Sequence, residues 1–499
     1  MALKTPFHLF VFLIAVASLG SVTQASATEW TKLTPQQKKL VTFVLPASSP
    51  TVWDDAEVRN FLRRHGTRTG IYHAVGMLYR NQGADADNSK RVIRRLLTLQ
   101  HNVPGKKLHG VWRTGLENDR EDENWREFVG TGLIVARERF GALMDAELIQ
   151  EIDAALVRAA EGAAKRNVFA HYSNIALMSA FLLDYAGKIS SNEELRKKGK
   201  EKAEQIFDLF SRHQTFVEFN SPTYYGVDLM GLAMWRELSP SPELRTWAEK
   251  IEAPFWRHLA QYYHAGLRNL CGPYARSYGM DMTKYVTIAG VAIAMGLEDQ
   301  APLPKTRARA FEWAYAPMLA LLNVQPPNDL LNEFKTFSGP REIRDQVNLM
   351  GLTFQAQAFL EDDWMMGAAT GMLRRWDQHF PGHIHWQTGE TIGWLLVPGE
   401  NAAKVKIIDR ALHVFLTRPD PKHPLRILIQ VPGLNTEGIR KDSWSLPGMT
   451  FEVQTPFPDP AIQIKDDKRL GKVIEVAFPV SPTHPSAPPA LILSPTKTD

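Results

Sequence analysis

A long succession of amphipathic segments, from about Trp53 to about Arg375, constrains the fold of this chain more than any other feature. Within each segment, apolar residues recur at spacings of three and four, which is the period of one face of an α-helix. The segments with this pattern are 55–77, 89–99, 125–140, 145–165, 174–185, 192–212, 224–237, 242–263, 284–295 and 306–322. So many apolar stripes must be buried against one another, and a ring of helical hairpins does this. The segments share no fixed repeat period, which disfavours a superhelical repeat array.

After His379 the sequence changes to short runs rich in Val, Ile, Leu and Phe, separated by Pro, Gly, Asp and Asn. These runs are 391–397, 404–416, 426–431, 449–454, 461–464 and 472–478. Their length and spacing are typical of a β-sandwich. The final stretch, 479–499, carries six prolines and predicts an extended tail that partly wraps or frays.

The chain has 499 residues, which favours two domains because single cores rarely exceed roughly 300 residues. We expect a signal peptide at 1–27 and an α/α toroid domain at 28–378, built as an incomplete (α/α)5–6 barrel. An antiparallel β-sandwich at 379–480 and a Pro-rich tail at 481–499 follow.

The N-terminal segment has the features of a secretory signal. Lys4 precedes an apolar run from Leu9 to Leu19, and small residues then end in Ala25-Ser26-Ala27, a typical cleavage site. The run is shorter than the ~20 residues of a membrane-spanning helix, which disfavours an uncleaved anchor. Cys271 is the one cysteine, so no intrachain disulfide can form, and this is typical of a bacterial envelope protein. We therefore expect a secreted or periplasmic bacterial protein with no membrane contact after cleavage.

The formal net charge is +4, and cleavage of the signal removes one positive charge with Lys4. A value this small indicates neither nucleic acid nor a membrane surface as partner. It is compatible with an acidic polysaccharide or oligosaccharide as substrate.

Four segments at predicted helix ends concentrate polar and aromatic residues. The first, 112–127, contains Trp112, Arg113, Asn124 and Trp125. Indole rings stack on sugar rings, while Arg and Asn bind hydroxyls or carboxylates. The alternative is a solvated loop in which one tryptophan anchors the next helix.

The second segment is His171-Tyr172-Ser173-Asn174, directly before an apolar helix. An amide at a helix start can donate to a substrate carboxylate, and a neighbouring His or Tyr can move protons. The alternative is a simple N-cap.

The third segment, 218–226, contains Glu218, Asn220, Tyr224 and Tyr225. One of the two adjacent tyrosines can pack inward while the other faces a cleft; the alternative is that both are packed at a helix entry.

The fourth segment, 272–282, presents Arg276 between Tyr274 and Tyr278. A guanidinium can bind a carboxylate with two hydrogen bonds. The alternative is a structural salt bridge to Asp281 or another acid.

His383 and His385 alternate on a predicted strand, so both side chains point to one face. They offer two metal ligands, but no third ligand has recognisable spacing. A polar contact between the domains is the alternative, and we expect neither metal nor cofactor.

Several of these pieces resemble motifs of known enzymes. Residues 218–225 resemble the E-x-S-P-x-Y-H piece of heparinase-like enzymes, with Tyr225 where those often carry His. Asn124-Trp125 followed by Gly130 resembles the N-W-W…E-I-G stretch of the chondroitin-lyase type, and residues 276–278 resemble the Arg and Tyr pairing of such enzymes. Over about residues 30–480 the chain thus resembles the toroid polysaccharide lyases, the heparinase II/III-like, alginate-lyase-like and chondroitin AC-lyase-like group.

This resemblance implies β-elimination at a uronic acid. The C5 proton lies α to a carboxylate, so neutralising that charge stabilises the developing enolate-like anion. A tyrosine or a histidine then abstracts the proton and returns it to the leaving oxygen. The resemblance implies catalytic roles for Asn174, Tyr225, Arg276 and Tyr278, and we also expect a catalytic role for His171 at the same helix start as Asn174. We expect substrate contacts from Trp112, Arg113, Asn124, Trp125, Tyr172, Asn220, Tyr224 and Tyr274.

Two other functions stay open at this point. A glycoside hydrolase would need two carboxyl groups roughly 5.5 Å or 6.5–9.5 Å apart. Candidates for such an acid and base are Glu218, Asp281, Asp119, Glu121, Asp122 and Glu123. A non-catalytic glycan-binding protein of the envelope is the other alternative, because a fold does not determine a function.

Overall fold

The computed structural model describes residues 30–117, 120–298, 300–304, 312–349, 351–371, 378–400, 403–481, 483, 485 and 488–498. The predicted signal peptide, the start of the predicted helix 306–322 and Asp119 lie outside these residues. In the part of the chain that the structure describes, no helix is both long and apolar enough to cross a membrane.

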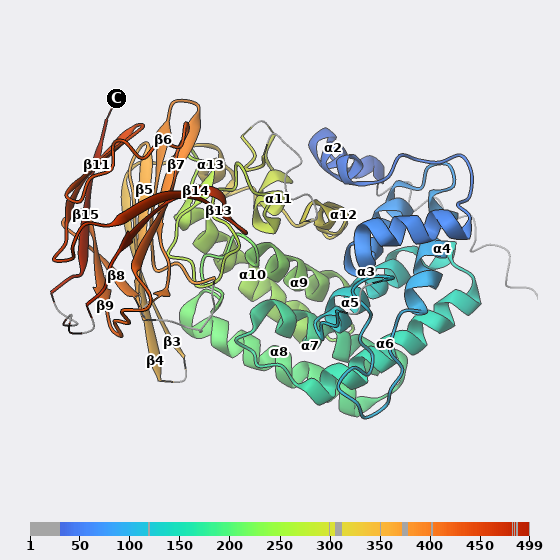
Figure 1. The fold of residues 1–499 in the computed structure, drawn as a ribbon. Coiled ribbons are helices and arrows are strands. Elements are labelled where there is room, and N and C mark those ends of the chain that lie inside the picture. The colour runs from blue at the N-terminus through green and yellow to red at the C-terminus, as the bar shows by residue number, and fades with distance from the viewer. Residues whose placement is uncertain are drawn as a thin grey trace, which may run out of the picture.

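A ring of inner helices forms the N-terminal part of the molecule (Figure 1). Its members are α3 (Asp55–Arg80), α5 (Trp125–Phe140), α7 (Ser173–Ile189), α9 (Tyr225–Leu238) and α11 (Ile288–Ala294). Each contacts the next, and α12 (Ala316–Leu321) contacts both α11 and α3, which closes the ring. These helices are buried on almost every side; α7, for example, is buried continuously from Ser173 to Gly187.

A second layer of helices covers the ring. It consists of α4 (Asp85–Leu97), α6 (Ala146–Arg166), α8 (Glu193–His213) and α10 (Pro242–Tyr262), while α2 (Pro35–Val44) packs on α12. These outer helices bury a single stripe each, as amphipathic helices do. Asp145 and Asn192 accept hydrogen bonds from the first turns of α6 and α8, as N-caps. The predicted α/α toroid is therefore confirmed.

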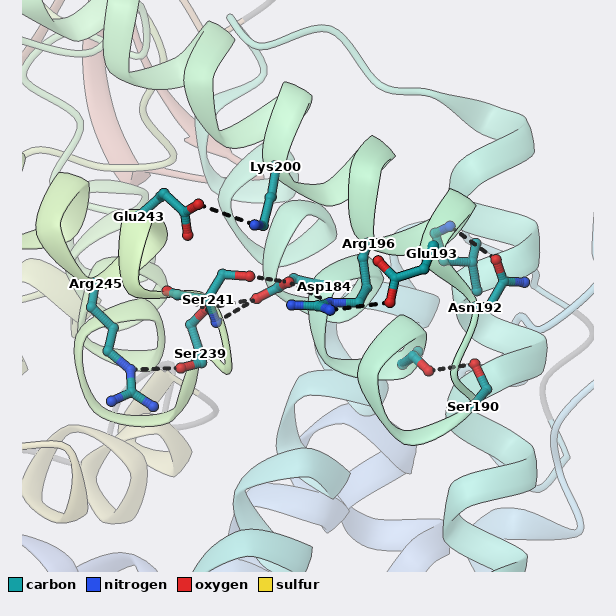
Figure 2. Close-up of polar contacts among 12 residues, drawn as sticks. Asp184, Ser190, Asn192, Glu193, Arg196, Lys200, Ser239, Ser241, Glu243 and Arg245 are labelled. Carbon is teal, nitrogen blue, oxygen red and sulfur yellow. Dashed lines mark hydrogen bonds and ion pairs between the residues drawn. The ribbon is translucent and has the colours of Figure 1, made fainter.

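A buried carboxylate holds two of the hairpins together at the end of α7 opposite to Ser173 (Figure 2). Asp184 accepts hydrogen bonds from Ser239 Oγ at 2.7 Å and Ser241 Oγ at 2.6 Å, in the turn between α9 and α10. Arg196 of α8 lies 4.0 Å from the same carboxylate. The two serines make Asp184 the junction of three helices at this end of the ring.

Two antiparallel sheets form the C-terminal part of the molecule. The larger has the order β13-β14-β10-β7-β6-β5-β4-β3, and the smaller has the order β11-β12-β15-β9-β8. The strands of the larger sheet are β3 (Arg341–Leu349), β4 (Leu352–Leu360), β5 (Trp364–Thr370), β6 (Gly382–Thr388), β7 (Thr391–Val397), β10 (Leu425–Gln430), β13 (Ala461–Asp467) and β14 (Gly471–Phe478). Those of the smaller sheet are β8 (Ala403–Ile408), β9 (Ala411–Leu416), β11 (Ser443–Leu446), β12 (Met449–Gln454) and β15 (Leu491–Lys497).

The larger sheet lies between the helices and the smaller sheet (Figure 1). One of its faces packs on the smaller sheet through residues such as Ile384 and Leu395, which meet Val414 and Leu493 in one apolar cluster. Its other face contacts the toroid, where the ring of Phe354 lies 5.3 Å from that of Phe219 and Tyr262 donates a hydrogen bond to Asp345. The predicted β-sandwich is confirmed, and it packs directly on the helical ring.

The β-structure begins earlier and ends later than the sequence predicts. Strands β3–β5 precede residue 379. The sequence did not indicate β3 and β5, because β3 is rich in charged and amide side chains and β5 in Met, Ala and Gly, which favour strands weakly. In the predicted tail, β15 pairs with both β12 and β9. Proline usually argues against a central strand, but Pro495 lies beyond the Leu491–Leu493 stretch that pairs with β9.

Candidate functional site

The starts of α7 and α9 meet the loop 272–278 at one end of the ring. Glu218, just before α9, is fully buried and accepts a hydrogen bond from Ser173 Oγ of α7 at 2.7 Å. Its other oxygen accepts from Arg276 Nη1 of the loop at 2.5 Å. Glu218 therefore fixes the positions of both partners, and the alternative prediction of an ion pair for Arg276 is confirmed with Glu218 as the acid.

The Arg276 guanidinium lies between two tyrosine rings. Its central carbon is 3.8 Å from the ring centroid of Tyr224 and 5.4 Å from that of Tyr172, and Nε donates to Gln378 at 3.1 Å. Stacking and an ion pair together fix the plane of a guanidinium, which is the geometry needed to bind a carboxylate. The loop itself is held by a β-bridge between Tyr274 and Phe380 of the β domain.

Tyr224 faces this arginine. Its hydroxyl donates a hydrogen bond to the Tyr278 hydroxyl at 2.7 Å. Burial raises the pKa of Tyr224 well above its usual value, and the nearby Arg276 charge opposes that rise. Two phenols and a cation thus lie together at the ring's end.

Tyr225 packs inward instead. It is fully buried, and its hydroxyl lies 2.9 Å from Thr215 Oγ1 and 3.3 Å from His258 Nε2 while accepting from Asn220 N at 2.8 Å. Burial raises the pKa of this phenol too. Asn220 belongs to the same inner network, since its Oδ1 lies 2.8 Å from His258 Nε2. Tyr225 and Asn220 thus hydrogen-bond to each other and to His258, whereas Tyr224 stacks on Arg276.

The start of α5 extends the site. Asn124 Nδ2 donates to the Tyr172 hydroxyl at 3.1 Å, and Arg166 donates to Asn124 Oδ1 at 2.8 Å. Arg166 also lies 3.6 Å from Glu127, and burial raises the pKa of Glu127 to about 7 in spite of that cation. The amide of Asn124 is thus held from both sides, with Tyr172 on the side of Arg276.

Arg68 of α3 is a site residue that sequence reasoning missed. Its guanidinium carbon lies 5.0 Å from the ring centroids of both Trp125 and Phe128. Burial lowers the pKa of Arg68, but nearby acidic groups, Tyr224 among them, raise it above its usual value. In the sequence, the helical pattern places Arg68 on the polar face of a helix. The available signal was Gly66, whose φ of +69° interrupts α3 just before Arg68 and turns the chain.

Two further predicted residues lie at the start of α7. Asn174 is buried. Its side-chain Oδ1 accepts a hydrogen bond from Ile175 N at 2.8 Å, and its backbone N–H donates to Glu218 Oε2 at 3.4 Å. His171 is half-buried and stacks on the ring of Phe169 at 5.2 Å.

Other predicted residues do not join this group. Trp112 is fully buried and forms a β-bridge with Gln100, so it serves as a core anchor. Arg113 is exposed. Tyr274 is buried and donates to Leu270 O at 2.7 Å.

The carboxyl groups considered for a hydrolase are distributed over several places. Glu121 pairs with His101 at 2.8 Å, Glu123 lies 3.2 Å from Lys107, and Asp122 accepts from Asn124 N at 3.0 Å. Asp281 accepts from Thr283 Oγ1 at 2.6 Å.

The acid beside Glu218 is one that the sequence did not single out. Asp228 of α9 lies 3.4 Å from Ser173 Oγ, which also binds Glu218. Burial, followed by the Glu218 charge, raises the pKa of Asp228 well above its usual value.

The two alternating histidines do point to one face. His383 Nδ1 lies 2.8 Å from His385 Nδ1, and His383 Nε2 accepts from Gly272 N at 2.7 Å. This contact joins the β domain to the loop that carries Arg276. Among the described residues, no group of three or more His, Cys, Asp or Glu side chains could hold a metal ion.

Comparison with known proteins gives one family and several distant folds. A family model described as "Domain of unknown function (DUF8769)" matches residues 52–324, more than half of the 499 residues. No curated protein matches the chain in sequence.

Among solved structures, the chain is similar to the chondroitin AC lyase of Streptomyces coelicolor A3 in complex with chondroitin sulphate, with 10% identity, a TM-score of 0.43, and coverage of 97% of this chain and 80% of that one. A chondroitinase AC lyase studied as oligosaccharide complexes gives 10% identity and a TM-score of 0.40, over 95% of this chain and 82% of that one. A mutant of the heparan sulfate lyase HepC from Pedobacter heparinus gives 10% identity and a TM-score of 0.34, over 97% and 92%.

Proposed function

The chain belongs to the family described as a domain of unknown function (DUF8769), and we propose that it is a polysaccharide lyase that cleaves a uronic-acid-containing glycan by β-elimination. One observation carries the proposal. Arg276 is held by Glu218 against the ring of Tyr224, whose hydroxyl meets that of Tyr278, at the end of the toroid where the starts of α7 and α9 meet. A fixed cation beside two phenols is suited to removing a proton α to a carboxylate.

In the proposed reaction, Arg276 and the side-chain amide of Asn174 donate to the uronate carboxylate. Their donors take up the charge that develops when the C5–H bond breaks, because that charge spreads onto the carboxylate oxygens. Arg276 is bound on one side by Glu218 and Gln378, so its plane is set before substrate arrives. Such preorganisation avoids reorienting the charge during the reaction.

The proton is moved by the Tyr224–Tyr278 pair. Tyr224 takes this role in place of Tyr225, since Tyr225 hydrogen-bonds within the inner network. The phenolate abstracts the C5 proton, the C4–O bond breaks, a C4=C5 double bond forms, and the phenol returns the proton to the leaving oxygen. The Tyr224 pKa is high when no substrate is bound, so the ionised form depends on the Arg276 charge, which acts in the opposite direction to burial.

Substrate rings are proposed to lie along Trp125, Tyr172 and Asn124. The Trp125 indole and Tyr172 phenol offer flat apolar faces, and Arg68 adds a second cation beside them. Two arginines along one wall favour an acidic glycan over a neutral one. As part of the same proposal, the predicted signal at 1–27 directs the enzyme out of a bacterial cytoplasm.

The test is incubation of the purified chain with a panel of uronate polysaccharides, followed by ultraviolet absorbance of the products. A lyase gives an unsaturated, absorbing uronate at each new non-reducing end. New reducing ends without absorbance would indicate a hydrolase and contradict the proposal. Binding without any turnover, measured on the same panel, would indicate a glycan-binding protein.

A further inference from the structure

A pocket lies beside the proposed active site, between the toroid and the β domain. It has a volume of about 150 Å³ and is lined by Asp281, Lys284, Trp394, Gln430 and Arg469, among others. A single water needs only ~15 Å³ of such space, so the pocket can take a ligand group of several heavy atoms.

One short loop links the pocket lining to the proposed site. Gly279 and Met280 line it, and they directly follow Tyr278. From the other side, Arg469 in the turn between β13 and β14 lies 6.0 Å from the Tyr278 ring centroid. Asp467 Oδ1 fixes this turn by accepting from the N–H groups of Arg469 at 2.8 Å and Leu470 at 2.9 Å. A glycan bound at Tyr278 therefore has the pocket as its next neighbour.

The charged residues in the pocket lining leave a net positive charge, with Lys284 and Arg469 opposing Asp281. Lys284 Nζ is held weakly: it lies 3.5 Å from each of Asp281 Oδ2, Ile392 O and Gln430 Oε1. Contacts at the outer limit of hydrogen bonding are readily exchanged for a stronger, charge-assisted bond to an anion.

One buried polar atom of the lining residues lacks a hydrogen bond within the described structure. It is Nε1 of Trp394, a residue that is 2% exposed. Buried polar groups normally have partners, and exceptions often mark places where water or a ligand binds. This indole N–H is an observation independent of the charge, and it indicates a polar ligand.

We propose that this pocket is a subsite for an acidic sugar residue, whose carboxylate binds Lys284 and Arg469 while Gln430 and Trp394 contact its hydroxyls and ring. The assignment to a glycan rests on the proposed function, but anion binding by the pocket does not. The β domain thereby contributes to recognition of the glycan through Arg469.

The first test measures binding without turnover. D-glucuronate and D-glucose are titrated into the full chain carrying Glu218→Gln and Arg276→Gln, in which the central cation is removed together with its acid. We expect glucuronate to bind and glucose not to bind. Adding Lys284→Met or Arg469→Gln should weaken glucuronate binding by about tenfold, the loss of one charge-assisted hydrogen bond. Arg469→Lys should restore most of it.

The matched control is Lys472→Met, an exposed lysine of the same hairpin outside the pocket lining. It should leave the glucuronate affinity unchanged. Equal binding of glucuronate in Lys284→Met and the parent, or equal binding of glucose and glucuronate, would overturn the subsite.

The second test uses the natural active site. If the chain degrades a uronate polysaccharide, Lys284→Met should raise KM by about tenfold with kcat nearly unchanged, because the pocket binds substrate away from the reacting bond. A lyase whose KM is unaffected contradicts the subsite alone. A chain with no lyase activity that still loses glucuronate binding in Lys284→Met contradicts the proposed function alone.

Discussion

Tyr224 and Tyr225 are neighbours in the sequence with opposite environments. The Tyr224 ring stacks on the Arg276 guanidinium, whereas the Tyr225 hydroxyl hydrogen-bonds with Thr215 and Asn220. The motif likeness placed the chemistry at Tyr225, and the sequence could state only that one of the pair packs inward. The choice depends on which side chain meets α10 through His258, a contact between residues far apart in the chain.

Substitution of the two tyrosines should separate chemistry from stability. Tyr224→Phe removes the proposed proton carrier and should lower kcat by about 10²–10⁴-fold while the fold is kept. Tyr225→Phe leaves buried partners of its hydroxyl unsatisfied and should cost about 1–3 kcal/mol of unfolding free energy with most turnover retained. Initial rates and urea unfolding measure the two effects. Activity lost in Tyr225→Phe but kept in Tyr224→Phe would reverse our assignment.

Arg276 and Glu218 form a buried pair whose halves depend on each other. Arg276→Gln leaves the fully buried Glu218 without its cation and should destabilise the chain by about 3–5 kcal/mol. The double change Glu218→Gln and Arg276→Gln should regain most of that stability but none of the turnover. Thermal unfolding and rate measurements on the three proteins check this. Recovery of activity in the double variant would show that Arg276 acts only on stability.

At the scale of elements, the sequence predicted the helices well because each buries a stripe at a regular period. The bounds 125–140 match α5, and the strands 391–397 and 449–454 match β7 and β12. Strands β3 and β15 were missed, since the first is charged and the second contains Pro495. Strand β15 is determined by pairing with β12 and β9, which lie far from it in the sequence, so a local pattern does not show these partners. Strand β3 pairs with the neighbouring β4, and its charged side chains hide this hairpin from an apolar pattern.

The junction at Asp184 (Figure 2) gives an element-scale prediction. Asp184→Ala leaves the hydroxyls of Ser239 and Ser241 without their acceptor, so we expect a loss of about 1.5–3 kcal/mol in unfolding free energy. The control is Glu193→Ala in the same group, because that side chain is 78% exposed and its ion pair with Arg196 contributes less than about 1 kcal/mol. Urea unfolding at pH 7 measures both. Equal effects would show that the junction does not hold the hairpins.

At the scale of the whole molecule, neutral histidines lie where the β domain meets the toroid. Burial lowers the pKa of His379 to about 4 and that of His385 to about 4 from an ordinary value of 6.5. The unfolded chain therefore binds more protons than the folded chain below pH 6.5. The contribution of these histidines to the unfolding free energy should be fully present above pH 6.5 and be lost as the pH falls from 6.5 through 4.

His379→Leu should reduce this acid sensitivity. Both ring nitrogens of His379 are buried without hydrogen-bond partners in the described part of the chain, so an apolar side chain loses little there. One histidine with this shift accounts for about 3 kcal/mol between pH 6.5 and 4. Unfolding free energies measured at several pH values should show a shallower slope for the variant. An unchanged slope would mean that other groups control acid unfolding.

Strand β15 lies inside the smaller sheet, between β12 and β9. During synthesis, β8, β9, β11 and β12 emerge before β15, so the smaller sheet stays split into two hairpins until residues 491–497 arrive. The apolar face of the larger sheet that these hairpins cover is therefore fully covered only when β15 has joined them.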